Sequence, residues 1–166
     1  RFAMPLEVGS PAPDFTLACS TGEDVSLSSL RGSRVVLWFY PKDNTPGCTN
    51  EACGFRDLQG EFQAAGAVTY GVSKDSIRSH GNFISKHGLN MPLLSDPEHE
   101  LQDNYGVWVE KKNYGRTYMG TERSTFLIAG PICSILLNQM ILRNHPGQHL
   151  VQIGPERDIA NDRIKL

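Results

Sequence analysis

Residues 34–40 constrain the fold of this chain more than any other stretch of the sequence. They read Arg-Val-Val-Leu-Trp-Phe-Tyr, a nearly continuous run of β-branched, aliphatic and aromatic side chains. A run of this kind, without polar alternation, is typical of a strand that is buried on both faces of a sheet. Pro41 ends the run, because proline cannot donate a hydrogen bond within a sheet. The sequence therefore predicts a central strand.

A helix is predicted to begin shortly after this strand. Thr45 is a favourable N-cap residue, and Pro46 suits the first helical position, where the backbone N–H has no partner in any case. Gly66 suits the position that ends a helix. Between these limits the apolar residues recur at helical spacing, which gives the helix one face to lay against the sheet. They are Ala52, Phe55, Leu58 and Phe62.

The rest of the chain continues this alternation as far as residue 128. Further strands are predicted at residues 15–18, 24–27, 68–73, 93–95 and 124–128, the first two as a hairpin, and further helices at residues 75–87 and 97–104. This order indicates an α/β sandwich with parallel pairing in its first half. No strand or helix pattern is evident at residues 144–166. Because the sequence contains no internal repeats or linkers, we expect a single domain over residues 1–166.

Composition narrows the functional classes. The 166 residues match one domain, and a formal net charge of −2 argues against a nucleic-acid surface driven by charge. No apolar run reaches the ~18–20 residues of a membrane span. Residues 1–13 lack the apolar stretch of a signal peptide, so we expect a cytoplasmic protein, or an organellar one after removal of a transit peptide.

No metal or cofactor motif is present. The four cysteines, Cys19, Cys48, Cys53 and Cys133, contain no Cys-x2-Cys pair, so we expect free thiols in a reducing compartment. The histidines show no ligand spacing, and His145 and His149, four residues apart, lack a third ligand. The sequence has no Gly-x-Gly-x-x-Gly and no phosphate loop. We therefore expect neither a metal nor a dissociable cofactor.

Cys48 falls in the first turn of the predicted helix. Unpaired N–H groups and the positive end of the helix dipole favour its thiolate there. The dipole supplies only about 0.3–2 kcal/mol, so a reactive thiolate needs a second cation. The alternative is a buried cysteine that acts as a small apolar side chain.

Cys53 lies five residues further along the same helix. In a regular helix the two Cα atoms are then ~8–9 Å apart, whereas a disulfide needs about 4.4–6.8 Å. Any Cys48–Cys53 disulfide therefore requires the first turns of the helix to unwind. The alternative is that Cys53 only packs.

Pro41, Thr45 and Cys48 form a Pro-x3-Thr-x2-Cys pattern that resembles the active-site signature of peroxiredoxins. The longer string Thr-Pro-Gly-Cys-Thr-x-Glu-Ala-Cys-x-Phe-Arg-Asp at residues 45–57 is similar to the branch that contains the bacterioferritin comigratory protein and its plant relatives. The resemblance covers residues 9–128. It implies a thioredoxin-like three-layer sandwich of the peroxiredoxin type, with a central mixed sheet flanked by helices. Residues 129–166 depart from the family pattern and form an atypical C-terminal segment.

The resemblance also implies roles for single residues. Cys48 would attack a peroxide oxygen and become a sulfenic acid. Thr45 would offer its hydroxyl to the peroxide or the sulfur, and Pro41 would shield the thiolate from water. Arg123 would supply the second cation, although an arginine at the start of a strand is by position alone more often solvated. Glu51 would orient that arginine.

Cys53 would then be the resolving thiol, condensing with the sulfenic acid to an intramolecular disulfide that thioredoxin or a similar dithiol reduces. The resemblance thus implies a thiol-dependent peroxidase for hydrogen peroxide and organic hydroperoxides, able to work as a monomer. One alternative is a redox sensor or disulfide exchange protein that uses the same cysteine pair. Another is a catalytically silent binding module.

Overall fold

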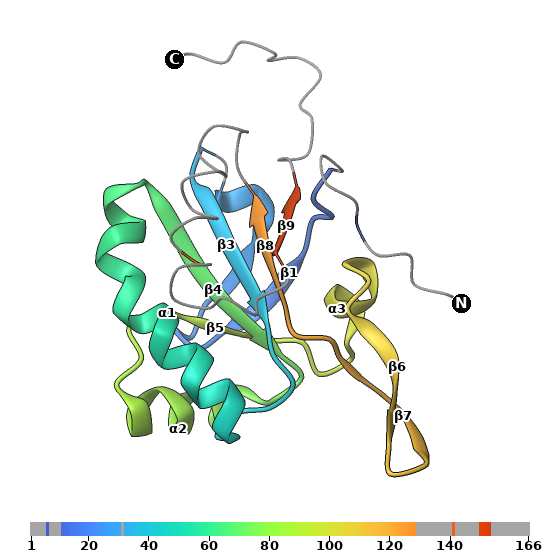
Figure 1. Ribbon diagram of the computed structural model, residues 1–166. Helices are drawn as coiled ribbons and strands as arrows, with labels where there is room; N and C mark the ends of the chain where they lie inside the picture. Colours follow the sequence, from blue (N-terminus) through green and yellow to red (C-terminus); the bar gives the residue numbers. More distant parts are fainter. Residues whose placement is uncertain (1–5, 7–10, 31, 129–140, 142–149, 154–166) are drawn as a thin grey trace.

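A computed structural model describes residues 6, 11–30, 32–128, 141 and 150–153 of the chain. Within these residues the main sheet has seven strands in the order β2-β1-β5-β4-β3-β8-β9 (Figure 1). Strands β3, β4 and β5 run parallel, and β8 runs antiparallel to β3. The predicted mixed sheet is therefore confirmed. The strands of this sheet are β1 (Thr16–Cys19), β2 (Asp24–Ser26), β3 (Arg34–Phe39), β4 (Ala67–Ser73), β5 (Leu93–Ser95), β8 (Ser124–Ile128) and β9 (Leu150–Ile153).

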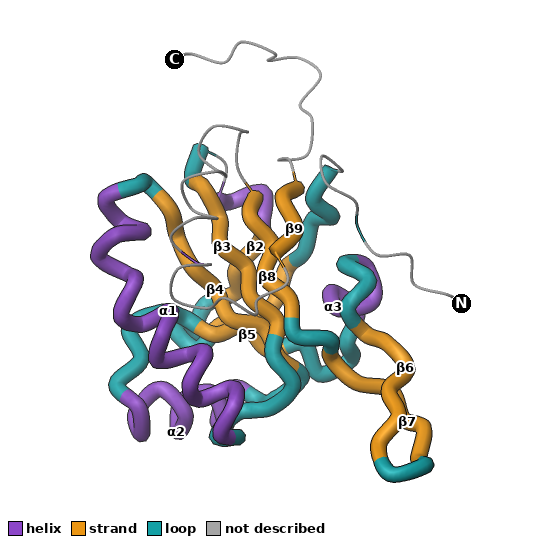
Figure 2. The backbone as a smooth tube through the Cα atoms, viewed as in Figure 1, coloured by secondary structure: helices purple, strands orange, loops and turns teal. Residues whose placement is uncertain are grey.

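Helices flank the sheet on both faces. Figure 2 shows α1 (Pro46–Ala64) and α2 (Ile77–His87) on one side and α3 (Glu100–Asn104) on the other. The 3-10 helix η1 (Leu27–Leu30) follows β2 directly. Together these elements form the predicted three-layer sandwich. No helix within the described residues combines the length and the apolar character needed to cross a membrane.

The alternation of side chains along β3 explains why its whole sequence is apolar. Trp38 packs in one buried cluster with Phe55 of α1 and Phe83 of α2. Its neighbour Phe39 points to the opposite face and packs in a second cluster with Leu101 of α3. Successive residues of a strand face opposite sides, so a strand covered on both sides needs apolar residues at every position.

Helix α1 begins where the sequence predicts, but its cap differs from expectation. Thr45 has the extended backbone of an N-cap residue, and Pro46 is the first helical residue. The Thr45 hydroxyl makes no capping hydrogen bond; instead Oγ1 donates to the Lys42 carbonyl at 2.9 Å. The predicted helix boundary is thus confirmed. The hydroxyl itself binds the preceding loop rather than the helix.

The remaining predicted elements are present with small shifts. Helix α2 starts after Ser76, whose side chain accepts a hydrogen bond from the backbone N–H of Ser79. It ends at Gly88, which has a φ of 59°. The helix predicted at residues 97–104 is shorter, because α3 begins only at Glu100.

Within the described residues, sequence reasoning missed η1, which begins at Leu27 where a strand was predicted, and two further parts of the fold. Strands β6 (Trp108–Asn113) and β7 (Arg116–Thr121) form a hairpin that projects from the body of the molecule (Figure 1). Strand β9 pairs parallel with β8, so the prediction of no strand in residues 144–166 is wrong at β9. Cys133, His145 and His149 lie outside the described residues.

Candidate active site

Strand pairing brings Arg123 to the start of α1. The antiparallel register of β3 and β8 pairs Phe39 with Ser124. The C-terminal end of β3 and the N-terminal end of β8 therefore lie at the same edge of the sheet. The loop that leads from β3 into α1 starts at this edge, and Arg123 directly precedes β8. Residues far apart in the sequence meet there.

Cys48 is buried at this edge, in the first turn of α1. Its exposure is only 1%, and its backbone lies among the N–H groups that have no partner within the helix. The Arg123 guanidinium donates a hydrogen bond from Nη2 to Cys48 Sγ at 3.2 Å. The guanidinium also lies beside Gly47, where a Cβ would be in ordinary contact, 3.4 Å from the same Nη2 atom.

Glu51 holds the other side of the guanidinium. Its Oε1 atom lies 3.1 Å from Arg123 Nη1, and its side chain is only 5% exposed. Burial alone would lower the pKa of Arg123, but the negative charge of Glu51 and the hydrogen bond to Cys48 raise the pKa above its ordinary value. The guanidinium therefore stays charged while it bridges the sulfur and the carboxylate. It also separates Glu51 from Cys48, which share one face of α1.

The other predicted site residues are placed around this group. Pro41 is half-buried in the loop between β3 and α1, and Thr45 closes that loop. Cys53 is half-buried on α1 and carries a free thiol, as do Cys19 and Cys48. Helix α1 is continuous through Cys48 and Cys53. The structure thus assembles Cys48, Arg123 and Glu51, and does not bond Cys53 to Cys48.

Sequence reasoning missed a buried polar group beneath the same loop. His80 Nδ1 lies 2.8 Å from Asp43 Oδ2, and both side chains are almost fully enclosed. Asp43 is one of the three unspecified positions between Pro41 and Thr45, and His80 lies in the predicted helix of residues 75–87. No periodic pattern connects them, since they come together only when α2 packs beside the loop. Within the described residues no group of three His, Cys, Asp or Glu side chains could hold a metal ion.

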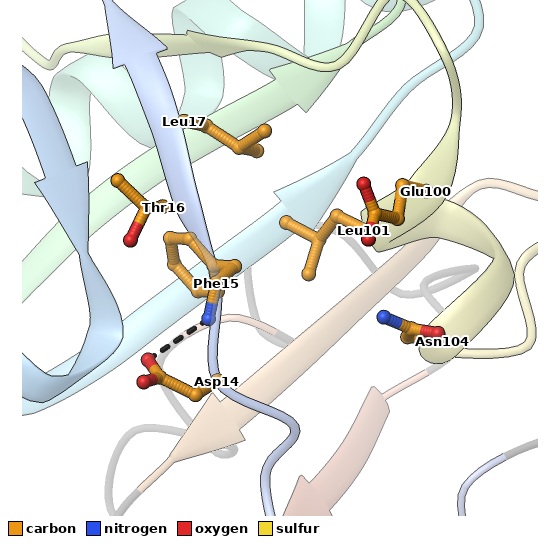
Figure 3. Close-up of a pocket in the computed structure, with 7 residues that line it drawn as sticks. All are labelled: Asp14, Phe15, Thr16, Leu17, Glu100, Leu101 and Asn104. Atoms are coloured by element: carbon orange, nitrogen blue, oxygen red, sulfur yellow. Dashed lines mark hydrogen bonds between the residues drawn. The ribbon is translucent and has the colours of Figure 1, made fainter.

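A small cavity lies elsewhere, between the start of β1 and α3 (Figure 3). It has a volume of about 90 Å³. Its lining includes two carboxylates, and no cysteine or arginine. The lining residues are Asp14, Phe15, Thr16, Leu17, Glu100, Leu101 and Asn104. Phe15 and Leu101 belong to the buried cluster on the face opposite Cys48. This cavity therefore takes no part in the Cys48 site.

Comparison with known proteins places this chain in a family. The model of the AhpC/TSA family matches residues 8–131. The chain is 51% identical over 125 residues to a putative peroxiredoxin bcp of Coxiella burnetii, covering 75% of this chain and 83% of the relative. It is 54% identical over 125 residues to peroxiredoxin Bcp of Bacillus subtilis, covering 75% and 80%.

Solved structures of related peroxiredoxins superpose on this chain. The bacterioferritin comigratory protein of Xanthomonas campestris superposes with a TM-score of 0.69 at 37% identity, covering 78% of this chain and 92% of that one. A cysteine-to-serine mutant of PrxQ of Xylella fastidiosa superposes with a TM-score of 0.73 at 32% identity, covering 86% and 99%. With a cysteine, an arginine and a glutamate assembled at the start of α1, the chain belongs to the AhpC/TSA family, in the peroxiredoxin branch of bacterioferritin comigratory protein and peroxiredoxin Q, and is a thiol peroxidase.

Proposed function

We propose that this protein reduces hydrogen peroxide and organic hydroperoxides through Cys48, and that Cys53 resolves the oxidised product. The observation that carries the proposal is the 3.2 Å contact between Arg123 Nη2 and Cys48 Sγ at the N-terminal end of α1. A permanent cation and a helix terminus both favour negative charge on the sulfur. The related Xanthomonas campestris protein has an alkyl peroxide reduction activity, which supports organic hydroperoxides as substrates.

In the first step the Cys48 thiolate attacks one oxygen of the peroxide. An S–O bond forms, the O–O bond breaks, and the departing alkoxide or hydroxide takes up a proton to leave as an alcohol or water. The product is the Cys48 sulfenic acid. Arg123 holds the oxygens through its remaining N–H donors, and the Thr45 hydroxyl turns from the Lys42 carbonyl to the peroxide. Pro41 keeps water from the sulfur.

In the second step the Cys53 thiolate attacks the sulfur of the sulfenic acid. An S–S bond forms and the hydroxyl group leaves as water after taking up a proton. Because both cysteines lie on one continuous helix, the first turns of α1 must unwind before the sulfurs can meet. The first turns of α1 can form again once the disulfide is reduced.

We further propose that thioredoxin or a similar dithiol reduces this disulfide by exchange, in a reducing compartment such as the cytoplasm. Both thiols lie in one chain, so the cycle requires no second subunit and a monomer suffices. The dithiol transfers two electrons to the pair and becomes a disulfide itself. Cys48 is thereby ready for the next peroxide molecule.

The proposal is tested by stopped-flow peroxide reduction combined with intact mass measurement. Cys48→Ser should abolish peroxide consumption, whereas Cys53→Ser should complete one rapid turnover and then stop, leaving a sulfenic acid that dimedone traps. Cys19→Ser is the matched control, since Cys19 is a buried free thiol in the cluster on the opposite face. Peroxide consumption by Cys48→Ser at the parent rate contradicts the proposal. Rapid dithiol exchange without any reaction with peroxide would favour a disulfide exchange protein instead.

A further inference from the structure

A buried polar network lies beneath the loop that carries Thr45 into α1. The carboxylate of Asp43 is at its centre. Its Oδ1 accepts a hydrogen bond from the Tyr40 hydroxyl at 2.6 Å. Its Oδ2 accepts one from the Ser79 hydroxyl at 2.7 Å and lies 2.8 Å from His80 Nδ1. Three donors from β3's end and α2 thus converge on a single loop residue.

The His80 ring makes a polar contact through each of its two nitrogens. Nε2 lies 2.9 Å from the Leu94 carbonyl oxygen, which can only accept a hydrogen bond. Nδ1 faces the Asp43 carboxylate, which already accepts from Tyr40 and Ser79. The ring is therefore held through both nitrogens, between the Leu94 carbonyl and the Asp43 carboxylate. Burial would raise the pKa of Asp43, but hydrogen bonds from His80, Tyr40 and Ser79 lower it below its ordinary value.

A second set of contacts fixes the backbone at the same residue. The Asp43 N–H donates to Asp75 Oδ2 at 2.9 Å, and Ser73 Oγ donates to the same oxygen at 2.7 Å. Ser95 Oγ donates to the Asp75 carbonyl. Asp43 is therefore tied through both its side chain and its backbone to β4, β5 and α2. Two of these elements are central strands of the sheet, and none of them is α1.

The position of this anchor gives it a part in the reaction. Asp43 lies two residues before Thr45 and five before Cys48, while Phe55, fully buried, holds α1 on its other side. The reactive segment is thus held at both ends. We propose that the Asp43–His80 pair is a clamp that fixes Thr45 and Cys48 in register with Arg123. Both are positioning residues for the peroxide step, an inference that rests on the proposed function.

The clamp affects the two chemical steps differently. Loosening it lets Cys48 drift from Arg123, which slows attack on the peroxide. The same loosening makes the first turn of α1 easier to unwind, so formation of the Cys48–Cys53 disulfide becomes no slower, and faster where unwinding limits it. In the folded protein, loss of a residue that only supports global stability would not slow the first step while leaving the second unchanged or faster.

The test uses Asp43→Asn, His80→Gln and the double variant at a temperature where thermal unfolding shows each to be folded. Each single variant should lower the second-order rate constant for Cys48 oxidation by hydrogen peroxide about tenfold, with disulfide formation unchanged or faster. The double variant should lose little more than either single variant, because the two residues act as one unit. Asp96→Asn is the matched control: this buried carboxylate accepts from the N–H groups of Leu101 and Gln102 and should leave both rates near those of the parent.

Several outcomes overturn the clamp. The proposal is wrong if both folded single variants oxidise at the parent rate. It is also wrong if the rates of Cys48 oxidation and of disulfide formation fall by the same factor. If Asp43→Asn does not fold, Ser79→Ala removes one hydrogen bond from the carboxylate and should slow oxidation about threefold; an unchanged rate in that variant also refutes the clamp. None of these results touches the proposed function, which fails only if Cys48→Ser still consumes peroxide.

Discussion

Replacing Arg123 with methionine should slow the reaction of Cys48 with peroxide by about 10–150-fold. Two unit charges at the observed 3.2 Å interact by about 5 kcal/mol at an effective dielectric constant of ~20. The Arg123 side chain is 34% exposed, so solvent screens part of this interaction. A charge-assisted hydrogen bond is worth about 1.5–3 kcal/mol net, which corresponds to the stated range of rates.

Glu51 provides a second arm of the same experiment. Arg123→Met removes the cation that lies against both this buried carboxylate and the Cys48 sulfur. Adding Glu51→Gln to Arg123→Met should therefore recover part of the lost rate, although Glu51→Gln alone should slow the parent. Arg123→Lys should react at a rate between those of the parent and Arg123→Met. A lysine keeps the positive charge but lacks the rigid fork of N–H donors that reaches both the sulfur and the carboxylate.

The assay is stopped-flow oxidation by hydrogen peroxide, followed by tryptophan fluorescence, with iodoacetamide alkylation as an independent measure of thiol reactivity. Arg116→Met is the matched control, since Arg116 is exposed on β7. It should react like the parent. If Arg123→Met reacts within threefold of the parent, the reasoning that assigns the cation to Arg123 is refuted.

Three further predictions concern stability. A Cβ at Gly71 would lie 2.7 Å from the Trp38 ring, so Gly71→Ala should lower the free energy of unfolding by about 1–3 kcal/mol in urea titrations, and a neutral result would contradict the packing. The pKa of Asp43 is lowered in the folded state, so its carboxylate adds stability that is fully present above the unfolded-state pKa and is lost as pH falls through the folded-state pKa. In acid, the free energy of unfolding of Asp43→Asn should therefore fall less steeply with pH than that of the parent. Tyr114 has a φ of 49° before Gly115 in a two-residue turn, so Tyr114→Asn should raise the melting temperature, and a decrease would be evidence against this turn.

The sequence predicts the strand–helix unit around Cys48 well because both of its elements are buried. Strand β3 is covered on both faces and so carries an unbroken apolar run, and the buried face of α1 repeats at helical spacing. Cys48 and Glu51 lie one helical turn apart, so their common face also follows from local spacing. These features depend only on neighbours in the sequence.

Arg123 could not be assigned by local reasoning. It lies 75 residues from Cys48, and only the register of β8 against β3 brings them together. The family resemblance supplied what spacing could not. The family resemblance gave no role to Asp43 or His80. The histidines show no ligand spacing in the sequence, and Asp43 and His80 come together only because α2 packs against the loop.

The β6–β7 hairpin was missed because most of its side chains are at least partly exposed. Four successive residues at the start of β7 are exposed, so no apolar alternation marks the strand. Tyr114 and Gly115 both adopt positive φ values in the turn. Only Gly115 is typical of such a turn, so the sequence lacks the Asn-Gly or Asp-Gly pair that would have indicated a hairpin.

The antiparallel pairing of β3 with β8 also determines when the chain becomes chemically competent. Cys48 and its helix are synthesised long before Arg123, which lies 75 residues further on. If Arg123 acts as proposed, a nascent chain carries this thiol without its cation and should reach its full reactivity with peroxide only once β8 has left the ribosome and paired with β3. In a refolding experiment, activity should accordingly recover when β8 pairs with β3, and not earlier when the helices form.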